Sequence, residues 1–165
     1  MKVIIYNGKA DNRWDNYVNN STSASAYHLI KWRDVVEKSF GHKTFYLMAE
    51  NEGGVRGILP LVLFNSKTFG KFMVSLPFFN YGGICAEDKE AFDSLLQAAV
   101  DIAEEKKAGH IELRHLSNHN LALPTKETKV SMLLELTDNP AELWDKLGPK
   151  VRNQVRKAEK SGLRV

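Results

Sequence analysis

Apolar residues recur at two spacings along this chain, and each spacing predicts one kind of secondary structure. Alternating or β-branched apolar runs predict strands at residues 3–6, 44–50, 55–64 and 71–76. The polar turn Asn51-Glu-Gly-Gly54 joins the second and third runs and is typical of a hairpin. Pro60 interrupts the third run, which predicts an edge strand or a bulge at that point.

Apolar residues three and four positions apart predict helices between these strands. The first helix is expected after a cap at Ser23, with Gly41 as its stop signal and an apolar face made of Leu29, Trp32, Val36 and Phe40. The clearest helix carries an apolar stripe over residues 92–103, and Gly109 is expected to close it. Residues 7–22 are a polar stretch that contains the aromatics Trp14 and Tyr17, and they predict a loop or a short helix.

The last third of the chain predicts two strands followed by two helices. The strands are expected at residues 110–115 and 129–136. Asn139, Pro140 and Glu142 supply a cap, a first-turn proline and an acid for a helix that runs to Leu147. A second, basic helix follows Gly148-Pro149, with Val151, Val155 and Ala158 expected to dock it to the core. The whole order predicts a mixed α/β domain.

Composition narrows the class of protein. The 165 residues are 43% hydrophobic and 26% charged, which fits one globular domain and excludes collagen-like, disordered and disulfide-scaffold proteins. The single cysteine, Cys85, cannot form an intrachain disulfide, which favours a reducing compartment and predicts a cytoplasmic protein. No window approaches the roughly 20 apolar residues of a membrane span, and the N-terminus is too polar for an export signal.

Charge is concentrated at the C-terminal end. Residues 146–165 hold seven Lys or Arg against one acid, Glu159, so this segment carries +6 and residues 1–145 carry −3. On a helix, Arg152 and Arg156 share one flank, whereas the other flank carries Lys150, Asn153 and Lys157. This arrangement favours an anionic ligand such as a phosphate to the same degree as it favours a solvated charged face.

The segment from Ser75 to Gly83 is the second candidate for ligand binding. It offers aromatic walls, one amide and glycine backbone that a ligand can approach closely, through Phe78, Phe79, Asn80, Tyr81 and the two glycines. A tightly packed corner explains the same residues equally well. The sequence holds no nucleophile elbow and no phosphate-binding loop.

Histidines and acids give no catalytic assignment. His115 and His119 have a metal-ligand spacing only on a shared helix, and a loop is predicted there, so no metal site is expected. His28 and Glu112 are conceivable general bases, but a buried, hydrogen-bonded role is favoured for each. The catalytic residues therefore stay unknown.

Several blocks, in this order and spacing, resemble the N-terminal half of FemAB-like proteins, particularly those associated with exosortase (PEP-CTERM) systems of bacteria. The resemblance spans almost the whole chain. Its blocks are Tyr27-His28, Trp32, Glu37-Lys-Ser-Phe-Gly-His42, Gly57-Ile-Leu-Pro-Leu-Val62, Ser75-Leu-Pro-Phe78, Asn80-Tyr-Gly-Gly83, Glu112-Leu-Arg114 and Lys150-Val-Arg-Asn-Gln-Val-Arg-Lys-Ala-Glu-Lys160. The Asn-Tyr-Gly-Gly and Arg-Asn-Gln-Val-Arg-Lys-Ala blocks are the most specific.

The resemblance implies a GNAT-like α/β fold, that of acyl-CoA N-acyltransferases, with a mixed sheet flanked by helices. It implies a two-domain transferase of which this chain is one half, with residues 1–147 as the first domain and residues 148–165 as a basic helix leading to a missing second domain. Relatives move an amino acid from aminoacyl-tRNA to the peptide of a cell-wall peptidoglycan precursor, with no metal and no covalently bound cofactor. The resemblance therefore implies that this half folds alone without turnover.

Three functional hypotheses follow. The leading one is the acceptor-side domain of an N-acyl or aminoacyl transferase acting in cell-envelope or exopolysaccharide metabolism. Its groove, facing a nucleotide-linked precursor or a tRNA, would be formed by Phe78, Phe79, Asn80, Tyr81, Lys150, Arg152, Asn153, Arg156 and Lys157. The second is an RNA- or nucleotide-binding module without catalysis. The third, a simple acyl-CoA N-acetyltransferase, is disfavoured because no Arg/Gln-x-x-Gly-x-Gly loop opens a helix.

Overall fold

A computed structural model describes residues 1–8, 11–117, 119, 121–126, 130 and 132–163 of the chain. Its helices and strands, in order, are β1 (Lys2–Ile5), α1 (Arg13–Asn20), the 3₁₀ turn η1 (Ala26–His28), α2 (Lys31–Phe40), β2 (Lys43–Asn51), β3 (Gly54–Ser66), β4 (Gly70–Val74), β5 (Cys85–Ala86), α3 (Lys89–Glu105), β6 (Ile111–Glu112), α4 (Pro140–Lys146) and α5 (Pro149–Lys160). The chain divides into two compact units, residues 1–121 and residues 122–165.

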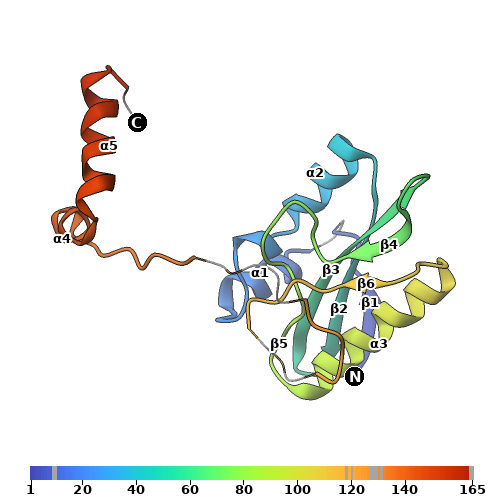
Figure 1. Cartoon of the computed structure of the whole chain (residues 1–165). Coiled ribbons are helices and arrows are strands. Elements are labelled where there is room, and N and C mark those ends of the chain that lie inside the picture. Colours follow the sequence, from blue (N-terminus) through green and yellow to red (C-terminus); the bar gives the residue numbers. More distant parts are fainter. Residues whose placement is uncertain (9–10, 118, 120, 127–129, 131, 164–165) are drawn as a thin grey trace. The chain divides into compact units, whose positions relative to one another are not determined.

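The first unit is a mixed sheet between helices, which confirms the predicted α/β class. The strand order is β1-β2-β3-β4-β6, and β5 pairs with β3. All neighbours are antiparallel except β4 and β6, which run parallel because α3 crosses between them. Figure 1 shows α1 and α2 on one face of this sheet and α3 on the other.

Two apolar clusters hold these layers together. Helix α3 buries the stripe Phe92, Leu95, Ala99 and Ala103 against the odd-numbered positions of β2 and β3. The even-numbered positions of the same strands face α1, where fully buried Trp14 stacks on Tyr6 and packs on Tyr46. The period of two along each strand thus fills both faces, as expected for a sheet that is covered on both sides.

The helix boundaries confirm some sequence signals and correct others. Gly41 ends α2 in the left-handed conformation, as predicted. The predicted start at Ser23 is wrong, because Ser25 instead caps the separate 3₁₀ turn η1, and α2 begins only at Lys31. The expected stop of α3 at Gly109 is also wrong. Helix α3 ends at Glu105, and Lys107 takes up the left-handed conformation at φ 55°.

Pro60 lies inside the sheet rather than at an outer edge or a bulge. It pairs with Tyr46 of β2, and the register irregularity falls instead between Ala49 and Glu50. On the other side of β3, pairing with β5 stops at Ile58 and pairing with β4 starts at Val62. Pro60 therefore occupies the gap between two partner strands, where a missing N–H leaves no acceptor unpaired.

The second unit, residues 122–165, contains α4 and α5. Asn139 caps α4 by accepting a hydrogen bond from the Ala141 N–H at 3.0 Å, and Pro140 occupies the first turn, as predicted. The strand expected at residues 129–136 is wrong for the residues of this stretch that are described, and residues 129 and 131 lie outside them. Its side chains are 63–90% exposed at Val130, Met132, Leu133, Leu134 and Leu136.

The predicted docking of the basic helix to the core concerns a contact between the two units, so it stays a prediction. Within the second unit, helix α5 is held by its own backbone bonds and by contacts with α4, and Val151 and Val155 are exposed. Among the described helices, none combines the length and apolar character that crossing a membrane requires.

Candidate functional site

The segment between β4 and β5, residues 75–84, is the most strained part of the first unit, and we call it the aromatic loop. Leu76 and Phe78 both have positive φ, 47° and 71°, which side chains other than glycine adopt at a cost of about 1–3 kcal/mol each. Leu76 is fully buried, so packing holds this conformation in place. Such strain is typical of loops that bind ligands.

Phe79 projects from this loop and packs against aromatic rings of η1 and α2. Its ring centroid lies 4.4 Å from that of Trp32 and 5.2 Å from that of Tyr27. Tyr27 also lies 6.4 Å from Tyr81, so one ring touches both ends of the aromatic segment. The aromatic residues of the loop therefore pack against rings of η1 and α2, and their role as the wall of a ligand groove stays a prediction.

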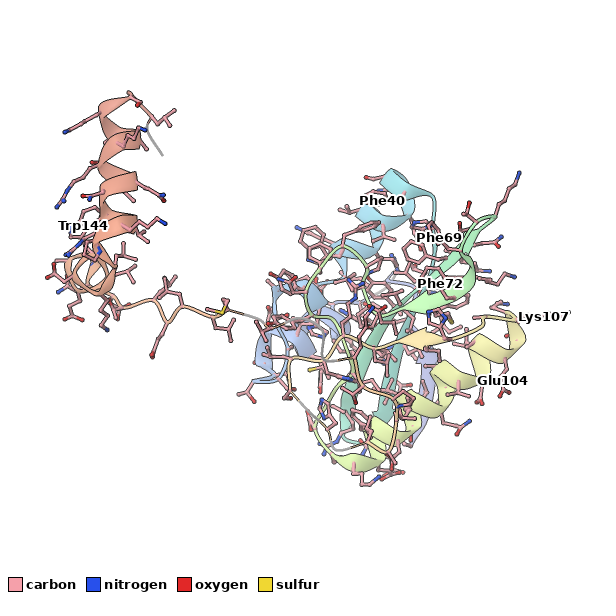
Figure 2. The ribbon with its side chains drawn as sticks, in the orientation of Figure 1. Phe40, Phe69, Phe72, Glu104, Lys107 and Trp144 are labelled. Carbon is pink, nitrogen blue, oxygen red and sulfur yellow. The ribbon has the colours of Figure 1, made fainter. Side chains whose placement is uncertain are left out.

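Phe78 packs against a second cluster of aromatic residues near the C-terminal end of α2. Its ring stacks on Phe40 at 4.4 Å and lies 6.4 Å from Phe64, which continues the row to Phe72. Figure 2 shows Phe40, Phe69 and Phe72 at this end of the first unit. Phe78 is 60% exposed and Asn80 is also exposed, so both are available to a ligand.

Arg114, just beyond β6, ties the aromatic loop to the sheet. Its Nη1 donates to the Phe79 carbonyl at 2.9 Å, and its Nε donates to Glu112 at 2.7 Å. Its backbone N–H donates to the buried Ser75 hydroxyl at 2.8 Å. Its carbonyl accepts from the N–H groups of the loop's two glycines at 3.1 and 2.9 Å. One residue thus fixes both ends of the loop.

Two histidines hold the C-terminal end of the loop. His28 is buried, its Nδ1 accepts from the Ser25 N–H, and its Nε2 therefore carries the proton and donates to the Gly83 carbonyl at 3.1 Å. His115 Nε2 accepts from the Ile84 N–H at 3.0 Å, which places the ring proton on Nδ1. Burial is the main reason that the pKa of each histidine is lowered, and the pKa of His115 falls to about 4.

Steric crowding explains why glycine occupies both positions of the glycine pair in the Asn-Tyr-Gly-Gly block. A Cβ on Gly83 would lie 2.4 Å from Cδ2 of His115, and a Cβ on Gly82 would lie 2.7 Å from Cβ of Leu76. No real Cβ contact is that short, so both positions require glycine. The block therefore marks close packing of His115 and Leu76 on the loop backbone.

The predicted basic residues lie on α5, in the second unit, where the two flanks differ. Arg152 pairs with Asp145 of α4 at 3.9 Å, and Arg156 lies over the Trp144 ring at 5.4 Å. The side chains of Lys150, Asn153 and Lys157 are exposed and have no partner within the described part of the chain. We call these three residues the open flank, and binding of an anion by α5 stays a prediction.

The two conceivable bases have different surroundings. His28 is buried and fully hydrogen-bonded, as favoured from the sequence. Glu112 is exposed and paired with Arg114, so its expected burial is wrong. His115 and His119 do meet, with ring centroids 4.4 Å apart, but the described residues contain no group of three side chains able to hold a metal ion.

The N-terminus of α3, which follows the aromatic loop and β5, is acidic. Asp88 caps it by accepting from the Ala91 N–H at 2.8 Å, and Arg56 pairs with both Asp88 and Glu87. The bond from Ala91, followed by that from Arg56, lowers the pKa of Asp88. Glu90 adds another acid in the first turn. A phosphate group would meet carboxylates here rather than free N–H groups.

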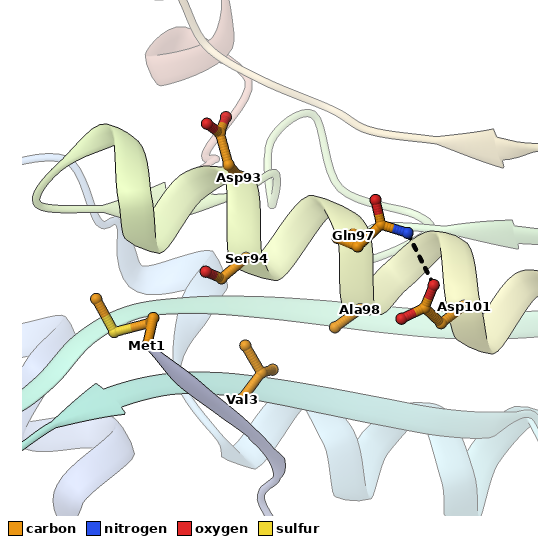
Figure 3. A pocket seen from close by; sticks show the side chains of 7 residues that line it. All are labelled: Met1, Val3, Asp93, Ser94, Gln97, Ala98 and Asp101. Atoms are coloured by element: carbon orange, nitrogen blue, oxygen red, sulfur yellow. Dashed lines mark hydrogen bonds between the residues drawn. The ribbon is translucent and has the colours of Figure 1, made fainter.

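A hollow of about 580 Å³ lies between β1 and α3, and no predicted site residue is among the residues that line it (Figure 3). Its polar side chains are largely paired with neighbours on the same helix, because Asp101 accepts from Gln97 at 2.8 Å and Asp93 pairs with Lys89.

Sequence reasoning missed Tyr27, Trp32 and Arg114 as site residues. The resemblance blocks contained all three, although nothing in their spacing ties them to the loop.

Comparison with known proteins identifies the fold. The chain matches no protein-family model and no curated protein sequence. Its structure is similar to the crystal structure of FemX, a FemAB-family member, with 21% identity and a TM-score of 0.53 over 66% of this chain. The chain spans about a quarter of the FemX length, 25%.

Two acetyltransferases share the fold over their whole length. An aminoglycoside antibiotic 6'-N-acetyltransferase from Acinetobacter haemolyticus aligns with 83% of this chain at 12% identity and a TM-score of 0.53. A GNAT family acetyltransferase of Staphylococcus aureus aligns with 81% at 13% identity and a TM-score of 0.51. Both are covered completely, so the fold is GNAT-like, as the sequence resemblance implied.

Proposed function

We propose that this chain forms the acceptor-side part of an N-acyl or aminoacyl transferase of the FemAB kind, acting in cell-envelope or exopolysaccharide metabolism. The observation that carries the proposal is the strained aromatic loop of a GNAT-like domain. Phe78 and Asn80 are exposed on this loop, and Phe79, between them in the sequence, packs against the rings of Tyr27 and Trp32. Aromatic rings beside an exposed amide suit the base or sugar of a nucleotide-linked precursor.

The open flank of α5 supports an anionic ligand. Lys150, Asn153 and Lys157 are exposed and unpaired among the described residues, whereas Arg152 and Arg156 already contact α4. The first turn of α5 holds no acid, and Gly148 supplies no side chain to cap it. Two lysines near one amide can bind the phosphates of a nucleotide-linked precursor or of a tRNA.

In the proposed reaction an amine attacks an activated ester carbonyl, and the protein's contribution is chiefly alignment. The aromatic loop would orient the acceptor, and the open flank would bind phosphates. No catalytic base is assigned, because His28 is hydrogen-bonded to the loop backbone and Glu112 is ion-paired with Arg114. The donor-binding part would lie in a further domain, so we expect the 165-residue chain to bind ligand without turnover.

The acyl-CoA N-acetyltransferase hypothesis fits this chain less well. An acyl-CoA carries phosphates that helix N-termini commonly bind. The N-terminus of α3 is instead filled by the Asp88 carboxylate, with Glu87 and Glu90 beside it. Like charges at this position disfavour a phosphate. The acidic start of α3 therefore disfavours coenzyme A as a ligand there.

A matched pair of double variants tests the proposal. Lys150→Gln with Lys157→Gln removes two positive charges from the open flank, and Arg152→Gln with Arg156→Gln removes two from the flank that contacts α4. Binding of UDP-N-acetylglucosamine and of an unstructured RNA 12-mer is measured across a salt series. The lysine pair should weaken binding of the nucleotide sugar more than the arginine pair does, because only the lysines are unpaired.

The same series separates the second hypothesis. A module that binds RNA without catalysis would ignore UDP-N-acetylglucosamine and bind the 12-mer with steep salt dependence, and the lysine pair would reduce that slope by about 1.4 for two lost phosphate contacts. If both double variants bind UDP-N-acetylglucosamine as the parent does, α5 is no part of the ligand site.

A further inference from the structure

One peptide unit of the aromatic loop is held from both sides by histidine rings. The Gly83 carbonyl accepts from His28 Nε2 at 3.1 Å, and the adjoining Ile84 N–H donates to His115 Nε2 at 3.0 Å. The two rings come from distant parts of the chain, η1 and the segment after β6. The bond from Ile84 requires His115 Nε2 to carry no proton, and the bond to the Gly83 carbonyl requires a proton on His28 Nε2. Because His28 Nδ1 accepts from the Ser25 N–H, the two rings are both neutral and in opposite tautomers.

We propose that His28 and His115 are positioning residues that clamp the Gly83–Ile84 peptide unit, and that the aromatic loop keeps its ligand-facing shape only while His115 is neutral. A protonated His115 carries N–H groups on both nitrogens, so its Nε2 can no longer accept from Ile84. The proton comes from solvent and no other bond changes. The inference rests on the proposed function for the ligand, whereas the clamp itself rests on geometry.

The clamp is connected to the aromatic rings of the loop through residues in direct contact. Tyr27, next to His28 in η1, packs on both Phe79 and Tyr81. Trp14 donates to the His28 carbonyl at 2.6 Å, so the backbone of η1 is anchored beneath the ring. Release of the Gly83–Ile84 unit would free the end of the loop that lies two residues from Tyr81.

The groups that act on His115 come from three elements. His28 on η1 and His119 in the segment after β6 are titratable, and both lower the pKa of His115 in addition to the effect of burial. Helix α3 presents the neutral Phe92 ring, which lies 5.8 Å from His115 and 4.9 Å from His119. No carboxylate is among the groups that act on His115, so nothing in the described surroundings stabilises its charged form.

The test uses the ¹⁵N-labelled full chain without ligand, which separates failure of the clamp from failure of the proposed function. Imidazole ¹⁵N shifts report the tautomers, amide exchange reports the Ile84 bond, and the Trp32 indole signal reports the ring next to Phe79. At neutral pH we expect the Nε2–H tautomer for His28 and the Nδ1–H tautomer for His115. On acidification the Ile84 and Trp32 signals should shift together with a midpoint near pH 4.

Three variants keep the proposal testable if acid unfolds the chain. His115→Phe retains a ring against Phe92 but has no acceptor, and it should raise Ile84 exchange about tenfold at pH 7. His115→Gln offers an uncharged acceptor, and it should restore protection and abolish the pH dependence. The control His110→Gln changes an exposed histidine whose ring makes no hydrogen bond to any described residue, and it should leave every signal in place.

The proposal is overturned if His115 titrates while the Ile84 and Trp32 signals stay constant, or if His115→Phe leaves Ile84 exchange unchanged. It is also overturned if the imidazole shifts show equal tautomers for the two histidines. UDP-N-acetylglucosamine is then added at pH 7. Weaker binding by His115→Phe with recovery in His115→Gln links the clamp to the site, whereas absence of binding in the parent refutes only the proposed ligand.

Discussion

Replacing Gly83 by alanine tests the packing of His115 on the aromatic loop. The added Cβ would lie 2.4 Å from Cδ2 of His115 and 2.9 Å from its Cγ and Nε2. Carbon atoms in contact lie about 3.5–4.0 Å apart, so the ring must move by more than about 1 Å. That movement carries Nε2 beyond hydrogen-bonding distance of the Ile84 N–H, which now lies at 3.0 Å.

The expected cost has two parts. Overpacking costs about 1–3 kcal/mol, and a buried N–H left without an acceptor costs about 1–3 kcal/mol more. We therefore expect Gly83→Ala to lower the free energy of unfolding by about 2–6 kcal/mol, a large part of the roughly 5–15 kcal/mol of a typical domain. Urea unfolding followed by far-UV circular dichroism measures this difference, with an unchanged slope if the unfolded state is unaffected.

Two companion variants make the result specific. Gly109→Ala adds a Cβ that meets only the Lys71 carbonyl at 3.6 Å, an ordinary contact, so its effect should stay within about 0.5 kcal/mol. In a His115→Ala background the obstacle is gone, and Gly83→Ala should then cost at least about 1 kcal/mol less. The reasoning is refuted if Gly83→Ala costs no more than Gly109→Ala, or if its cost is the same in both backgrounds.

Two further outcomes follow from the same region. Trp14→Phe keeps a buried ring but removes the donor to the His28 carbonyl, so urea unfolding should show a loss of about 1–3 kcal/mol, and a loss below about 0.5 kcal/mol would contradict the anchoring role of this bond. The pKa of His115 is about 4 in the folded chain and about 6.5 when unfolded, so its contribution is complete above pH 6.5 and declines as pH falls towards 4. Unfolding measured across this window should lose about 2 kcal/mol, after allowance for partial solvent exposure, and an equal decline in His115→Gln would assign it to other groups.

Short-range patterns predicted the parts of the fold that local chemistry decides. The hairpin around Asn51 to Gly54, the left-handed stop at Gly41 and the cap at Asn139 all depend on residues within four positions of one another. The aromatic loop could be singled out for the same reason, because proline, aromatic residues and a glycine pair stand next to each other.

Long-range contacts explain most of what the patterns missed. Arg114 lies 35 positions from the Phe79 carbonyl that it binds, and His28 lies 55 positions from Gly83. The positive φ of Leu76 and Phe78 arises from packing and bonding of the loop, and neither residue type prefers it. Pro60 follows the same rule, because the gap between β4 and β5 exists only in the assembled sheet.

An NMR titration of the ¹⁵N-labelled chain tests the central claim most directly, namely that the aromatic loop binds a nucleotide-linked precursor and not an acyl-CoA. UDP-N-acetylglucosamine and coenzyme A are added separately at pH 7 while the Trp32 indole and the amides of Phe78 to Ile84 are followed. The account predicts shifts in these signals with the nucleotide sugar, and none there or at Asp88 to Ala91 with coenzyme A. Shifts at Asp88 to Ala91 with coenzyme A, and an unresponsive loop with the nucleotide sugar, would contradict it.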